Sequence, residues 1–89
     1  MGKNWSVSLE HGEYENDLGL VIKDAIDAVL ATEAGYYVNI VTPEIFNRPD
    51  VYLTEALNLY FDSSINVKYI DQCGCGGHVL RVWKKELSI

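Results

Sequence analysis

The chain has 89 residues, of which 48% are hydrophobic and 22% are charged, and its formal net charge is −6 at pH 7. This length and composition predict one globular domain over residues 1–89 and exclude a disordered chain. The acidic balance argues against nucleic-acid and anionic-membrane partners, since both require a basic surface. No apolar run approaches the roughly 20 residues that span a bilayer.

Two stretches in the first half have the composition of strands. Residues 5–12 alternate apolar and polar side chains, with Trp5, Val7 and Leu9 on one face, which predicts a strand with one buried face. Residues 36–43 are nearly continuously apolar and rich in β-branched and aromatic side chains. This pattern favours a central strand that is buried on both faces or nearly so, ended by Pro43.

Two stretches have helical spacing. Residues 15–35 place apolar side chains three and four positions apart, which predicts an amphipathic helix. We expect Asn16 or Asp17 to cap its start and Gly35 to end it in a left-handed conformation. Residues 49–64 predict a second helix that begins at Pro49. Its expected apolar stripe is Leu53, Ala56, Leu57, Tyr60 and Phe61.

Two further strands are predicted near the C-terminus, at residues 65–70 and 78–83. The first alternates Ile65, Val67 and Tyr69 with Asn66, Lys68 and Ile70. A short glycine-rich link between the strands predicts an antiparallel hairpin, whereas the earlier strand–helix–strand unit favours parallel neighbours. The expected fold is therefore α+β: a two-layer βαβαββ sandwich, with a mixed four-stranded sheet and two helices on one face. The order of the strands in the sheet does not follow from the sequence.

The link itself, "QCGCGGH" at residues 72–78, has an unusual composition. Cys73 and Cys75 are the only cysteines, and a pair so close cannot form a disulfide framework across a fold. Together with the lack of an apolar signal segment at the N-terminus, this favours a reducing, cytoplasmic location. The plainest interpretation is a hairpin turn whose glycines allow positive φ. A turn, however, needs fewer than three glycines, and free cysteines are more often buried.

Three kinds of chemistry fit this composition. Cys73, Cys75 and His78 could ligate zinc, copper or an iron–sulfur cluster, with His11, Asp71 or a second protomer completing the site; His78 could also be a strand residue that faces water. Oxidation of the cysteine pair would give a strained, easily reduced disulfide. The third option is modification, because a thiol beside accessible glycine Cα–H groups suits radical crosslinking. The chain shows no catalytic constellation of its own, so we expect no enzyme activity.

Four segments carry a resemblance to a known family: "NWSVSLE", "YYVNIVTPE", "YLTEALNLYF" and "VKYIDQCGCGGHVLRV". They resemble the small archaeal and bacterial proteins called the CGCGG family. These are proposed to be ribosomally synthesised, post-translationally modified peptides (RiPPs) that are paired with a radical SAM maturase. The resemblance implies a non-enzymatic precursor without a cofactor of its own, modified at Cys73, Gly74, Cys75, Gly76 and Gly77, with Gln72 and His78 framing the site.

The family resemblance leaves alternatives open. Typical modified peptides have a flexible leader and a short disordered core, whereas this chain reads as a folded domain, so the whole fold could serve as the recognition handle. The "CGCG" segment is also similar to the end of A-type iron–sulfur carriers, but a third cysteine is lacking here. A role as such an iron–sulfur carrier would then need a homodimer that contributes two cysteine pairs, four thiolates in all. The leading interpretation is a substrate protein with a thioether-type modification, and the alternative is a thiol-based carrier.

Overall fold

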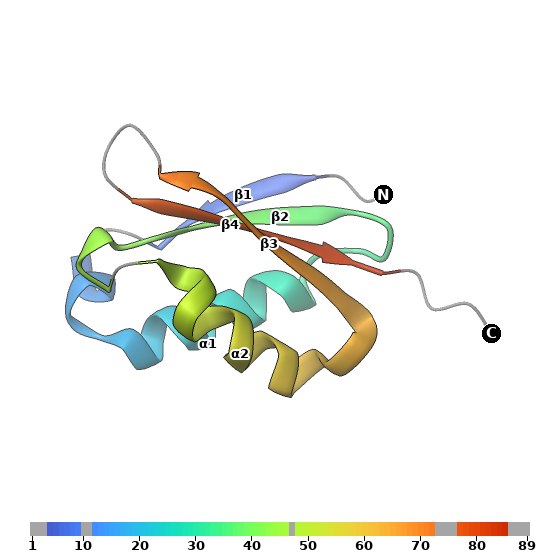
Figure 1. Cartoon of the computed structure of the whole chain (residues 1–89), viewed down its shortest axis with the longest axis horizontal. Helices are drawn as coiled ribbons and strands as arrows, with labels where there is room; N and C mark the ends of the chain where they lie inside the picture. Colours follow the sequence, from blue (N-terminus) through green and yellow to red (C-terminus); the bar gives the residue numbers. More distant parts are fainter. Residues whose placement is uncertain (1–3, 10–11, 47, 73–76, 86–89) are drawn as a thin grey trace.

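Four strands form a mixed sheet, and two helices lie against one of its faces (Figure 1). The structure is a computed structural model and describes residues 4–9, 12–46, 48–72 and 77–85. The elements in chain order are β1 (Trp5–Ser8), α1 (Leu18–Leu30), β2 (Tyr37–Thr42), α2 (Pro49–Phe61), β3 (Ile65–Gln72) and β4 (His78–Lys84); 3₁₀ turns occupy Gly12–Asn16, Glu44–Phe46 and Asp62–Ser64. The predicted α+β class and element order are confirmed.

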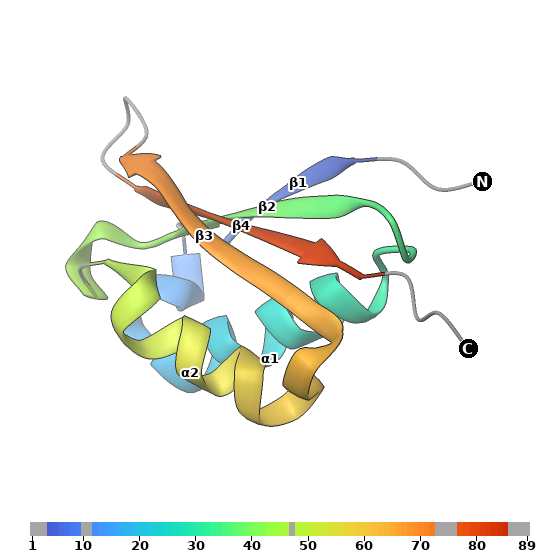
Figure 2. The same ribbon diagram turned by 45° about the vertical axis from the view of Figure 1, so that its right-hand side comes forward.

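The strands lie in the order β1-β2-β4-β3. β1 and β2 are parallel, as expected for strands joined through a helix, and β4 is antiparallel to both β2 and β3. The predicted β3–β4 hairpin is therefore confirmed. The last strand inserts between β2 and β3, which makes β3 an edge strand, and the turned view of Figure 2 shows β3 above α2.

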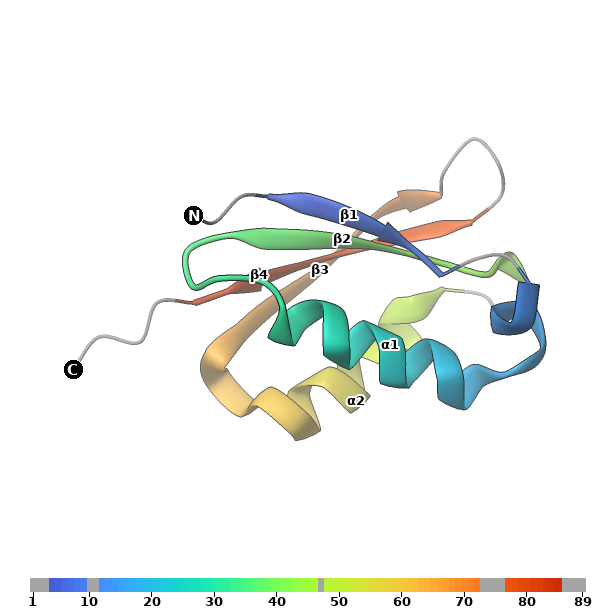
Figure 3. The ribbon, with the colours of Figure 1, turned by 180° about the vertical axis from the view of Figure 1, so that it is seen from behind.

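The two layers meet in one apolar core. Figure 3 shows α1 under the β1–β2 half of the sheet, and α2 contacts β3 and β4. The buried apolar residues come from both layers: Leu9, Val21, Ala25, Ala28, Val29, Val38, Ile40, Leu53, Leu57, Ile65, Leu80 and Val82. Neither described helix is both long and apolar enough to cross a bilayer.

The prediction that β2 is buried on both faces or nearly so is confirmed in full for one face and only in part for the other. Val38, Ile40 and Thr42 are buried against the helices, whereas the alternate residues are only half-buried. The reason is that both helices lie on the same face, so nothing among the described residues covers the other one. We call that uncovered side the open face. β1 and β3 alternate as predicted.

The first helix is shorter than the predicted range 15–35. Asp17 caps its start as expected, and its carboxylate accepts a hydrogen bond from the Leu20 amide at 3.1 Å. The helix ends at Leu30 rather than at Gly35, because Thr32 folds back to its last turn and its hydroxyl donates to the Ala28 carbonyl at 2.8 Å. Gly35 does adopt positive φ (89°), but in the turn that enters β2.

The second helix begins at Pro49 as predicted and ends at Phe61, with a 3₁₀ turn in place of its expected last residues. Leu53 and Leu57 are fully buried, but Tyr60 is 59% exposed and does not belong to the buried stripe. Successive buried positions are four residues apart, so the stripe continues to Phe61. The Tyr60 ring instead contacts that of Phe61 edge-on, with 4.8 Å between ring centroids.

Candidate functional site

The cysteine-containing segment leaves and re-enters the sheet between two paired strands. Gln72, the last residue of β3, lies opposite His78, the first residue of β4, and His78 also pairs with Thr42 of β2. Gly77 is buried. The predicted residues Cys73, Gly74, Cys75 and Gly76 lie outside the described residues. Both ends of the segment are thus held at one end of the sheet, opposite the end where β1 begins and β4 ends (Figure 1).

His78 does not face water, which corrects one of the sequence-based interpretations. Its side chain is 9% exposed and lies on the helix-covered face, in line with the buried residues Leu80 and Val82 of β4. Its Nδ1 atom is 2.9 Å from the Tyr69 hydroxyl, and the ring tautomer decides which of the two donates the hydrogen bond. The hydrogen bond leaves Nε2 as the ring nitrogen that is not engaged with Tyr69.

Tyr69 is fixed from two directions. Tyr69 pairs with Leu80 of β4, which makes it a diagonal neighbour of His78. The bulge that follows, between Tyr69 and Asp71, places Asp71 opposite Val79 rather than opposite His78. The guanidinium of Arg48 lies over the tyrosine ring, 4.2 Å from its centroid. Asp50 orients this guanidinium through two hydrogen bonds of 3.2 and 2.9 Å. Tyr69, which forms the hydrogen bond with His78, is therefore itself held by a cation–π contact with Arg48.

A second tyrosine adds to this polar cluster from α2. The Tyr52 hydroxyl is buried, and within the described part of the chain no group meets strict hydrogen-bond geometry with it. Burial raises the pKa of Tyr52 above its ordinary value of 10.0, and the nearby Thr42 hydroxyl opposes the rise. That hydroxyl donates to the His78 carbonyl at 3.3 Å. Thr42, Tyr52, Tyr69 and His78 thus form what we call the polar cluster, on the helix-covered side at the end of the sheet where residues 73–77 leave it.

A hollow of about 490 Å³ opens near the polar cluster, just after the end of β2. Its described lining includes Glu15, Pro43, Glu44 and Ile45. Pro43 follows Thr42, the β2 partner of His78, so the hollow lies at the same end of the sheet. Its two glutamates make its described rim acidic.

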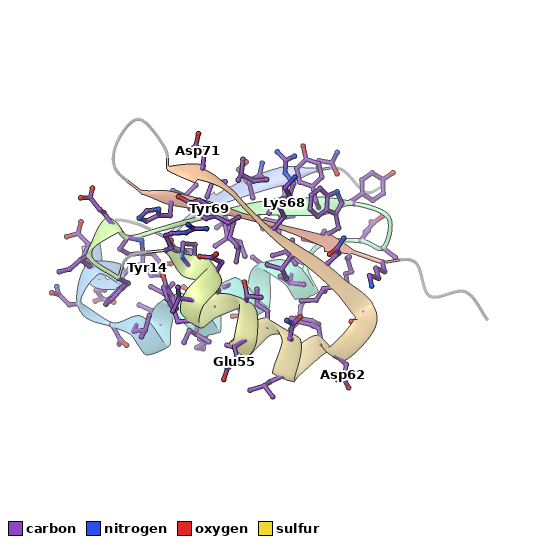
Figure 4. All side chains as sticks on the ribbon, in the orientation of Figure 1. Tyr14, Glu55, Asp62, Lys68, Tyr69 and Asp71 are labelled. Atoms are coloured by element: carbon purple, nitrogen blue, oxygen red, sulfur yellow. The ribbon has the colours of Figure 1, made fainter. Side chains whose placement is uncertain are left out.

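The described residues contain no group of three or more His, Cys, Asp and Glu side chains that could hold a metal ion. By themselves they therefore supply no group of ligands for the metal-site hypothesis. Asp71, one candidate fourth ligand, pairs with Val79 and points away from the helices, whereas His78 lies on the helix-covered face (Figure 4). The fold therefore separates these two side chains. His11, the other candidate, lies outside the described residues.

Sequence reasoning did not find the other members of the polar cluster. Thr42 and Tyr69 read as strand residues and Tyr52 as an ordinary helix residue, and their meeting depends on the strand order. A histidine directly after a glycine-rich link was the only available signal. It indicated His78 itself but not its partners.

Comparison with known proteins agrees with the resemblance seen in the sequence. The family described as "Putative radical SAM target protein" matches residues 1–85. No curated protein and no solved structure matches the chain. Since the matched range covers nearly the whole chain, including β1 to β4, the chain belongs to this family.

Proposed function

We propose that the chain is a non-enzymatic substrate protein whose Cys73–Gly77 segment is modified by a radical SAM enzyme. The observation that carries the proposal is the family match over residues 1–85, which includes the whole hairpin. The fold supports it, because β3 and β4 deliver both ends of the segment to one edge of the molecule. A segment that begins and ends at the same place can enter a partner's active site without unfolding the domain.

The expected product is a thioether between a cysteine sulfur and a glycine Cα. The adenosyl radical of the enzyme removes one hydrogen atom from the glycine Cα and leaves as 5′-deoxyadenosine. The cysteine thiol then loses its proton to solvent, its sulfur bonds to the carbon radical, and the surplus electron returns to the enzyme's iron–sulfur cluster. The S–H and Cα–H bonds are broken and one C–S bond is formed. S-adenosylmethionine is the oxidant and is consumed as 5′-deoxyadenosine and methionine.

Intact mass and thiol counting test this proposal. The chain is produced alone, with the radical SAM enzyme of its own organism, and with a variant of that enzyme that lacks its cluster cysteines. Only the active enzyme should lower the mass by a pair of hydrogen atoms per crosslink and remove alkylatable thiols that reductant does not restore. Cys73→Ser and Cys75→Ser then identify the crosslinked sulfur. Two free thiols and an unchanged mass in protein from the native host would refute the proposal.

A carrier of zinc, copper, an iron–sulfur cluster or sulfur is the second candidate. One observation favours it: His78 has one ring nitrogen bound to Tyr69, which is the arrangement that orients a metal-binding histidine. Cys73, Cys75 and the His78 Nε2 atom would then be the ligands, and a homodimer could double the thiolates. Metal and persulfide analysis of the same purified samples decides between the two functions, since a carrier loses its cargo in Cys→Ser variants while its polypeptide mass stays unmodified.

A further inference from the structure

The open face of the sheet carries side chains of a different character from the rest of the surface. On β2 and β4, Tyr37 and Trp83 lie opposite each other, with ring centroids 5.9 Å apart in an edge-to-face arrangement. The guanidinium of Arg81 lies over both rings, 4.2 Å from the Tyr37 centroid and 5.7 Å from the Trp83 centroid. All three side chains are half-buried. The face is therefore ordered and aromatic although no helix covers it.

Two positive charges meet on this face. Lys68 of β3 lies directly opposite Arg81 of β4. Like charges at directly opposite positions of adjacent strands destabilise a sheet. Neither residue forms an ion pair with a described carboxylate, whereas Lys23 and Arg48 do. Instead Arg81 is held by the Asn39 side-chain oxygen at 2.8 Å and by the two rings.

Charge is divided between the two layers of the molecule. Within the described strands the only carboxylate is that of Asp71, at the hairpin end of β3. Acidic residues are instead frequent on the helices, the 3₁₀ turns and the segments beside them: Glu13, Glu15, Asp17, Asp24, Asp27, Glu33, Glu44, Asp50, Glu55 and Asp62. Figure 4 shows Lys68 on the open face and Glu55 and Asp62 on the helix layer. A chain with net charge −6 thus keeps a basic, aromatic surface on one side.

We propose that this surface, which we call the sheet-face patch (Tyr37, Lys68, Arg81 and Trp83), is where an acidic surface of the radical SAM enzyme binds. The inference rests on the proposed function. Charge complementarity carries it: an acidic partner would relieve the repulsion between Lys68 and Arg81, and aromatic and arginine side chains are favoured at protein interfaces. The patch and the Cys73–Gly77 segment share strands β3 and β4, so an enzyme bound to the patch contacts the strands that carry the segment.

Charge and symmetry argue against two ways in which a second copy of the chain would occupy the patch. A symmetric dimer through the open faces would bring the Lys68 and Arg81 pairs of two chains together, which adds like-charge repulsion. Stacking of the patch on the acidic helix layer of a second copy would satisfy the charges but would not close, and would produce open chains of molecules. Both would appear as self-association of the protein alone.

The experiment compares modification rates of whole-chain variants by the purified enzyme that modifies the wild-type chain. Lys68→Glu and Arg81→Glu change the patch, and Lys23→Glu on α1 is the matched control because it makes the same charge change on the helix layer. We expect each patch variant to raise KM about tenfold or more with little change in kcat, and the control to leave both near wild type. Raised salt should increase the KM of the wild-type chain and reduce the difference in KM between the wild type and the patch variants.

Lys68→Glu separates a binding defect from a folding defect. It places an acidic side chain opposite Arg81, so the variant should unfold at a higher temperature than wild type while being a poorer substrate. Patch variants that match the control in KM would overturn the docking inference and leave the proposed function intact. Wild-type protein that the enzyme does not modify would overturn both. Self-association of the wild type that Lys68→Glu abolishes would assign the patch to a second copy and also refute the inference.

Discussion

The buried hydroxyl of Tyr52 makes Tyr52→Phe an informative substitution. Among the described residues no group meets strict hydrogen-bond geometry with the hydroxyl, although the Thr42 hydroxyl lies near it, and the ring packs edge-on against Phe46 with 6.4 Å between centroids. The variant keeps the ring contacts and removes only the oxygen. A buried polar group without a partner costs about 1–3 kcal/mol. Because the Tyr52 side chain as a whole is only partly buried, we take the lower end and expect a gain of about 1 kcal/mol.

Thermal and urea unfolding, followed by circular dichroism, measure this gain. For a domain of this size it corresponds to a rise in Tm of about 4–8 °C. Tyr14→Phe is the matched control, because the Tyr14 hydroxyl donates to the Asp24 carboxylate at 2.7 Å and its loss should lower stability. A Tyr52→Phe variant that is destabilised like the control would refute the reasoning, since it would mean that the hydroxyl has a partner in the folded protein.

The same tyrosine predicts a loss of stability in alkali. Burial raises the pKa of Tyr52 in the folded protein above the ordinary value of 10.0. Between these two values the folded protein holds a proton that the unfolded chain has released. The contribution of protonated Tyr52 to the free energy of unfolding is therefore complete below pH 10. It is lost as the pH rises through the folded-state pKa. Tyr52→Phe should lose less stability than wild type over this range, as urea unfolding at a series of pH values would show; equal losses would contradict the assignment.

Three other substitutions test separate parts of the structure by urea unfolding. Asp17→Ala removes the cap of α1 and should cost about 1 kcal/mol; no loss would mean that water caps the helix equally well. Lys68→Glu should stabilise the chain by about 0.2–1 kcal/mol through attraction to Arg81, and a loss would show that the cross-strand charges do not interact. Tyr69→Phe should cost about 0.5–1.5 kcal/mol and alter the NMR signals of the His78 ring; an unchanged ring would disprove the hydrogen bond.

The sequence predicted the elements because each one shows its own periodicity. The alternation at Trp5, Val7 and Leu9 and the three- and four-residue spacing in residues 15–35 and 49–64 reflect which side chains face the core, and the core lies between the same two layers throughout. The hairpin followed from the short glycine-rich link. The identity of the radical SAM target family followed from the residues around that link, and the match over residues 1–85 confirmed it.

What the sequence did not predict depends on contacts between distant segments. The position of β4 between β2 and β3 is one such feature. Another is the burial of β2, which is complete only on the face where both helices lie, although its apolar composition suggested burial on both faces or nearly so. The early end of α1 depends on Thr32, whose hydroxyl also accepts a hydrogen bond at 2.9 Å from the Trp5 indole on β1. The polar cluster depends on the strand order, which places His78 of β4 between Thr42 of β2 and Tyr69 of β3. None of these features changes the local pattern of apolar residues.

A substrate that is recognised as a folded protein should respond to destabilisation in the opposite way from one that is recognised as a linear peptide. The sheet-face patch joins Tyr37 of β2 to Trp83 of β4, so it exists only while the sheet is formed. Leu80→Ala removes a fully buried side chain from β4 without altering the cysteine segment or the patch. It should cost about 2–5 kcal/mol, a large share of the roughly 4–13 kcal/mol expected for a domain of this length.

The rate of modification near the unfolding midpoint of Leu80→Ala decides between the two modes. An enzyme that reads the fold should modify the variant more slowly than wild type at that temperature, in proportion to the unfolded fraction. At lower temperature, where both chains are folded, the rates should agree. An enzyme that reads only the residues around Cys73 should act on the unfolded chain at least as fast, because the segment is then more accessible. A faster reaction of the variant would therefore exclude the whole fold as the recognition element and leave the segment alone in that role.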